Sequence, residues 1–123
     1  METYKKGVAQ LTKMLGEEQA SLIIDKFNSL SPVFEQEAVS VVFGRTWSRE
    51  QLDLKTRSLC SICILAALGR VNALKINFAL AVENGATSDE MVEALLQVAI
   101  YAGYPAALDA LSILHEVLQG QNA

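Results

Sequence analysis

Two cysteines three positions apart, Cys60 and Cys63, have the spacing that most directly suggests chemistry. On a helix this spacing puts both sulfurs on one face, where they could pair. Redox work would need a lowered thiol pKa, yet the flanking residues are apolar and no cation or histidine adjoins the pair. We therefore interpret both as small buried hydrophobic side chains, with a redox thiol pair as the alternative. Two cysteines and one distant histidine, His115, do not complete a zinc site, so no metal is expected.

Three residues near the middle of the chain, Arg45, Trp47 and Arg57, could bind an anion. Arginine holds a carboxylate through two parallel hydrogen bonds, and tryptophan offers a flat apolar wall. Tyr101 and Tyr104 flank a glycine at a helix break, where their hydroxyls could enter a pocket. The alternative is structural: surface arginines, a core tryptophan, and tyrosines that cap a packed helix end. His115, alone on the last helix, is interpreted as structural or exposed.

Helices must position these residues, because alanine and leucine dominate, prolines number two, and β-branched alternation is almost absent. Ser31, Asp53 and Thr87 are predicted N-caps, with Glu90 completing a capping box after Thr87. We expect Gly44 to interrupt the third helix and a polar loop to follow at residues 46–51. The predicted all-α fold has about six to seven helices, over residues 4–15, 17–30, 32–43, 54–68, 71–83, 88–102 and 105–118.

The composition limits the class of protein. The chain has 123 residues, 51% hydrophobic and 20% charged, with a net charge of −4, which excludes a disordered tail and the usual basic nucleic-acid binder. No uncharged run reaches a membrane span and the start does not resemble a signal peptide, so we expect a soluble cytoplasmic protein. Residues 58–123 carry two basic and six acidic side chains among many apolar ones. One small domain cannot easily bury several such helices, which predicts self-association through this half.

Three stretches of the chain carry a resemblance to a known family. They are Leu52–Leu59 (LDLKTRSL), Glu83–Thr87 (ENGAT) and Val98–Ala107 (VAIYAGYPAA). Together they resemble the two signatures of the carboxymuconolactone decarboxylase family, over about residues 33–118. Residues 4–30 look like the N-terminal helices of its short single-domain members, so the resemblance covers one domain, residues 1–123.

The resemblance implies an all-helical alkylhydroperoxidase D-like bundle and a ring-like homo-oligomer, commonly a trimer or a hexamer. The best-known activity of the family is cofactor-free loss of CO2 from 4-carboxymuconolactone, which gives an enol-lactone. A second branch consists of thiol peroxidases that use a Cys-x-x-Cys, a histidine and a glutamate as a proton relay.

The residues of the thiol branch are not found at the matching positions. Its cysteines would fall at Arg70 and Ala73, its histidine at Asn77 and its glutamate at Ser58. The cysteines of this chain lie ten residues earlier, inside the preceding helix. A peroxidase of that branch would therefore lack its nucleophile, its resolving thiol and its base.

The decarboxylase branch matches better, since Trp47, Arg57 and Ser58 agree with it. This branch tends to have histidine where this chain has Asn77, and an acid where it has Arg45. Asparagine can hydrogen-bond a lactone or carboxylate oxygen, but it cannot shuttle a proton at neutral pH. A pocket altered in this way can still bind anions.

Three functions follow from these observations. The first is a decarboxylase-like enzyme, without cofactor, acting on a small carboxylated lactone or related anion. Either arginine would hold the carboxylate, and Asn77 would polarise an oxygen. The second is a non-catalytic oligomeric binding protein on the same scaffold, and the third a thiol hydroperoxidase using Cys60 and Cys63. The first hypothesis assigns catalytic roles to Arg45, Arg57, Ser58 and Asn77, and pocket roles to Trp47, Tyr101 and Tyr104.

Overall fold

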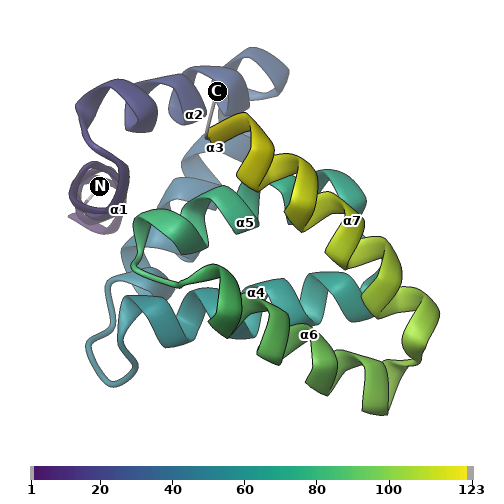
Figure 1. The fold of residues 1–123 in the computed structure, drawn as a ribbon. Coiled ribbons are helices and arrows are strands. Elements are labelled where there is room, and N and C mark those ends of the chain that lie inside the picture. Colours follow the sequence, from purple (N-terminus) through teal and green to yellow (C-terminus); the bar gives the residue numbers. More distant parts are fainter. Residues whose placement is uncertain (1, 122–123) are drawn as a thin grey trace. The chain divides into compact units, whose positions relative to one another are not determined.

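The computed structural model describes residues 2–121, and within this range every regular element is helical. No helix in these residues is long and apolar enough to cross a membrane. The elements, labelled in Figure 1, are α1 (Glu2–Leu15), α2 (Glu17–Leu30), α3 (Pro32–Ala38), the π-helical segment η1 (Val39–Trp47), α4 (Leu54–Leu68), α5 (Val71–Glu83), α6 (Ser88–Ala102) and α7 (Tyr104–Gln121). The prediction of an all-α protein is confirmed.

The helix starts follow local chemistry. The side chains of Ser31, Asp53 and Thr87 each accept a hydrogen bond from the backbone N–H three residues later, at 3.1, 2.7 and 3.1 Å. Each bond satisfies an amide that would otherwise have no partner in the first turn. Glu90 returns a bond to the Thr87 N–H at 2.9 Å and so completes the predicted capping box. At the other end of α4, Gly69 adopts the left-handed conformation that ends the helix.

The helices group into two compact units with a boundary between Leu52 and Asp53. In the first unit α1 packs against η1 and α2, while α3 packs against α2 and η1. Leu11, Ala20 and Val39 form its fully buried centre. The prediction that the whole chain forms a single domain stays a prediction.

The expected helix break at Gly44 is wrong, because helical structure continues through it to Trp47. Gly44 instead allows a close approach: a Cβ there would overlap the carbonyl oxygen of Thr3 on α1. Gly7 does the same from the other side, since its Cβ would overlap the Val39 carbonyl oxygen. The predicted polar loop, residues 46–51, is accordingly displaced: the segment between η1 and α4 comprises residues 48–53. Residues 39–47 form a π-helical segment. π-helical geometry is rare in proteins as a whole, and where it occurs it is often at a functional site.

The second unit consists of α4, α5, α6 and α7 (Figure 1), and buried side chains between these helices form one apolar core. Each helix contributes buried side chains to this core. Its largest fully buried members are Phe78 on α5, Ile62 on α4, and Met91 and Leu95 on α6. A packed core of this kind fixes the relative positions of the polar residues on the same four helices.

Candidate functional site

Arg57 and Ser58, the two predicted site residues on α4, lie in the first turns of that helix. Ser58 is 1% exposed, and its Oγ accepts a hydrogen bond of 2.9 Å from Nδ2 of Asn84, the residue that caps α5. Arg57 is half-buried, and its Nε is enclosed without a hydrogen-bond partner among the described residues. A buried guanidinium N–H without a partner is costly, so this N–H is suited to donate a hydrogen bond to an oxygen of a ligand.

Asn77 lies half-buried on α5, and its amide group is partly committed to its own helix. Nδ2 donates a hydrogen bond of 2.8 Å to the carbonyl of Ala73 one turn earlier. This bond fixes the orientation of the amide. An amide has two N–H donors and a carbonyl oxygen, so one N–H and the oxygen remain to contact a ligand.

The N-terminal end of α4 is held against α6 by an ion pair. Nζ of Lys55 lies 2.9 Å from Oε2 of Glu90, and both side chains are more than a third exposed. The backbone N–H of Thr87 and the Lys55 ammonium together lower the pKa of Glu90, while the hydrogen bond from Lys55 to Glu90 raises the pKa of Lys55. The energetic contribution of such an exposed pair is small, so it adds one weak contact between α6 and the turn that carries Arg57 and Ser58.

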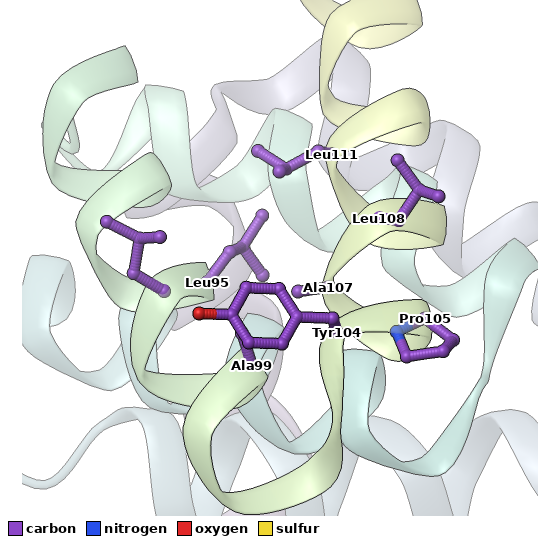
Figure 2. Close-up of a pocket in the computed structure, with 8 residues that line it drawn as sticks. Leu95, Ala99, Tyr104, Pro105, Ala107, Leu108 and Leu111 are labelled. Atoms are coloured by element: carbon purple, nitrogen blue, oxygen red, sulfur yellow. The ribbon is translucent and has the colours of Figure 1, made fainter.

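The two predicted pocket tyrosines lie on the α6–α7 pair. An apolar groove of about 390 Å³ runs between these helices, lined by alanine, leucine, proline and Tyr104. Figure 2 shows the Tyr104 ring directed from the start of α7 toward Leu95 and Ala99 on α6. Tyr101 is 83% exposed and is not among the residues that line the groove. Of this pair, Tyr104 therefore lines this groove and Tyr101 does not.

The cysteines differ from each other, which corrects the expectation that both are buried. Cys60 is exposed, whereas Cys63 is half-buried with its thiol 3.5 Å from the Ala94 carbonyl, to which it donates. Cys60 lies on the exposed face of α4. Because apolar residues occur on both faces of this helix, the sequence did not show which face is exposed. Burial raises the pKa of Cys63, and the charge of Cys60 adds to this. A raised thiol pKa disfavours the thiolate that peroxidase chemistry needs.

Arg45 and Trp47 belong to the first unit, where η1 carries both. Trp47 is 6% exposed, as expected of a core tryptophan. Arg45 lines an open depression with Lys5, Lys6 and Arg49, among other residues of α1 and the end of η1. His115 on α7, interpreted from the sequence as structural or exposed, is exposed, and its Nε2 lies 3.5 Å from the Gln119 amide.

Comparison with known proteins identifies the family of this helical arrangement. The family model described as carboxymuconolactone decarboxylase matches residues 32–116, which run from the start of α3 almost to the end of α7. The chain belongs to the carboxymuconolactone decarboxylase family. It is 34% identical to 4-carboxymuconolactone decarboxylase of Acinetobacter baylyi over 96% of this chain and 88% of that protein.

Two further relatives of this carboxymuconolactone decarboxylase family member are more distant. An uncharacterised 15.0 kDa protein of Paracoccus denitrificans is 33% identical over 72% of this chain and 67% of its own length. Nitrosuccinic acid decarboxylase of Metarhizium robertsii is 30% identical over 62% of this chain and 53% of its own length. Two of the three relatives are thus named as decarboxylases.

Sequence reasoning missed Asn84 and the basic companions of Arg45. Asn84 was interpreted only as a helix end, because Asn-Gly is a common C-cap pair. Its additional bond to Ser58 joins residues 26 positions apart and needs the α4–α5 packing to form. Lys5 and Lys6 were not connected with Arg45, since nothing in the spacing showed that α1 would lie against η1. The glycines at positions 7 and 44 were the available signal for that contact.

Proposed function

We propose that this protein is a cofactor-free decarboxylase acting on a small carboxylated anion, with a carboxylated lactone as the first candidate. The observation that carries the proposal is the enclosed, unpartnered Nε of Arg57 beside the Ser58–Asn84 hydrogen bond. This group lies in the part of the chain that matches the family. The two relatives named as decarboxylases, of 4-carboxymuconolactone and of nitrosuccinic acid, support the reaction class.

Each residue has a role that its surroundings permit. Of the two candidate arginines we assign the carboxylate to Arg57, because its Nε lacks a partner. Ser58, held by Asn84, keeps the first turns of α4 in place and acts as a positioning residue. Asn77 donates its remaining N–H to a substrate oxygen, whose negative charge grows during the reaction. Trp47, Tyr101 and Tyr104 as pocket walls remain predictions.

The reaction needs one proton, and the side chains assigned to the site do not supply it. Loss of CO2 breaks a carbon–carbon bond and leaves an electron pair on the substrate, delocalised onto the lactone carbonyl. Protonation of carbon then gives the enol-lactone. Asparagine has no proton to give at neutral pH, so we assign the proton to water. An enzyme of this kind is slower than one with histidine at position 77, but its rate does not depend on an imidazole pKa.

The test is turnover of 4-carboxymuconolactone, followed by CO2 release and enol-lactone absorbance. Replacing Arg57 with alanine removes a charged hydrogen bond worth about 1.5–3 kcal/mol, so kcat/KM falls by about 10- to 150-fold. Arg57→Lys rescues little of this, because lysine is a point charge without the fork. Lys75→Ala, which removes an exposed cation from α5, is the matched control and leaves kcat/KM unchanged. Equal losses in Arg57→Ala and Lys75→Ala would contradict the assignment.

A specific observation favours a second function, an oligomeric binding protein without catalysis. Both positions where the family tends to have proton-transfer groups carry other residues, Asn77 and Arg45. Asn77→His separates the two functions, since histidine can exchange a proton near pH 6.5. In an enzyme this change raises kcat and introduces a pH dependence. If neither the natural protein nor Asn77→His turns over the lactone, the result favours the binding protein.

We also propose that the protein assembles as a homo-oligomer, a trimer or a hexamer, in the cytoplasm. The second unit supports this through large apolar side chains that stay exposed on α6 and α7. They include Leu96, Ile100, Tyr101, Tyr104 and Leu108. Exposed apolar side chains grouped on neighbouring helices are typical of interaction surfaces. Light scattering tests the assembly, and Ile100→Glu on the exposed face of α6 is expected to reduce the particle mass.

A further inference from the structure

The open depression between α1 and η1 collects positive charge on a protein that is negative overall. Its volume is about 860 Å³, and it is lined by Lys5, Lys6, Arg45 and Arg49, with Glu2 as the one acid in the lining. Four of the ten lysines and arginines of the chain therefore meet here, although the net charge of the protein is −4. With one opposing carboxylate, the lining carries a formal charge of +3.

None of these four cations is paired within the part of the chain that the structure describes. The ion pair found in residues 2–121 joins Lys55 to Glu90 and involves none of the residues of the depression. Glu2, although it lines the same depression, lies beyond ion-pair distance of all four. Unpaired like charges in one concavity repel one another and concentrate anions from solution. A bound anion would remove that repulsion.

The walls of the depression are built from two backbones in direct contact. Gly7 and Gly44 lack the Cβ atoms that would keep α1 and η1 apart, so the helices meet at Val39 and Thr3. Arg45 lies in the last turn of η1, and Arg49 lies four residues later, in the segment that follows this helix. The first turn of α1 forms another part of the lining, at the end of this helix where the helix dipole is positive.

From these observations we infer that the α1–η1 depression binds a small oxyanion with two or more negative charges, a polycarboxylate or a phosphate. A lining of +3 favours a multiply charged ligand over a singly charged one. The two arginines supply forked donors that match carboxylate and phosphate oxygens. Ser48, also in the lining, donates its hydroxyl at 2.6 Å to the Gly44 carbonyl, so the cations supply the binding. The inference concerns binding alone and does not depend on the proposed decarboxylation.

Calorimetric titration of the full chain tests this binding. The probes are citrate, inorganic phosphate and acetate, at matched ionic strength and without lactone. The first two probes are multiply charged and differ in their chemistry, and acetate is the singly charged control. We expect citrate or phosphate to bind at least tenfold more tightly than acetate, and the tighter of the two identifies the chemistry of the ligand. Binding of neither above acetate would overturn the inference.

Two variants locate the binding. Arg49→Ala removes a charged donor from the depression and is expected to weaken the preferred anion by about tenfold or more. Lys13→Ala removes an exposed cation from the same helix α1 but outside the lining, and is expected to change the affinity less than twofold. Equal weakening in both variants would show diffuse attraction and overturn the site. A protein that binds citrate yet releases no CO2 keeps this inference and loses the proposed function.

Discussion

Replacing Gly7 with alanine tests the contact on which the first unit is built. The new Cβ would overlap the Val39 carbonyl oxygen and would lie 2.9 Å from both the carbonyl carbon and Cγ1 of that residue. Backbone atoms cannot rotate away as the end of a side chain can, so α1 and η1 must separate. Overpacking of this kind costs about 1–3 kcal/mol. Because the overlap is with backbone atoms, the cost lies in the upper part of this range, at about 2–3 kcal/mol. Alanine recovers about 1 kcal/mol of helix propensity, so we expect a net loss of about 1–2 kcal/mol.

Urea unfolding followed by circular dichroism, at one fixed protein concentration, measures this loss. With a urea dependence of about 1–3 kcal/mol per molar, the midpoint falls by about 0.3–2 M. Gly120→Ala is the matched control: this glycine is also helical, on α7, and a Cβ there meets nothing within 4 Å. Its midpoint is expected to stay equal or to rise slightly. A midpoint for Gly7→Ala at or above that of the natural protein would refute the close helix contact.

Three other predictions follow from local contacts. A double-mutant cycle with Ser58→Ala and Asn84→Ala is expected to give a coupling of about 0.5–1.5 kcal/mol in urea unfolding; a value near zero would contradict the hydrogen bond. The folded state lowers the pKa of Glu90, so its stabilising effect is complete above the ordinary carboxyl range near pH 4.3 and is lost as the pH falls through the lowered value. Acidification from pH 6 to pH 3 should then destabilise the natural protein more than Glu90→Gln, and equal losses would contradict this. A thiol reagent counted by mass spectrometry should modify Cys60 before Cys63, because burial raises the pKa of Cys63; the reverse order would contradict the difference in exposure.

Local signals were sufficient for most of the helix boundaries. The caps at Ser31, Asp53 and Thr87 depend on bonds within four residues, which the sequence contains in full. Gly44 shows where such reasoning ends. A glycine can end a helix or let another backbone approach, and the choice at this position depends on α1, more than thirty residues earlier. Helix periodicity alone could not decide between the two.

The sequence predicted which residues belong to the candidate site, but only part of the contacts between them. Arg57 and Ser58 were identified from a short motif, and they lie in the first turns of α4, where Ser58 and the Nε of Arg57 are buried. The partner of Ser58, Asn84, comes from α5 and is set by tertiary packing. The exposure of Cys60 was missed for a related reason, since a helix that is apolar on most sides does not reveal which face looks outward.

The central claim is that a chain with asparagine at position 77 still removes CO2 from a small carboxylated anion. The most direct measurement is CO2 release from 4-carboxymuconolactone by the natural protein, between pH 5 and pH 9. We predict measurable turnover with a rate that shows no step near pH 6.5, together with a large loss of kcat/KM in Arg57→Ala. No CO2 above the uncatalysed background, or turnover that Arg57→Ala leaves unchanged, would contradict the account.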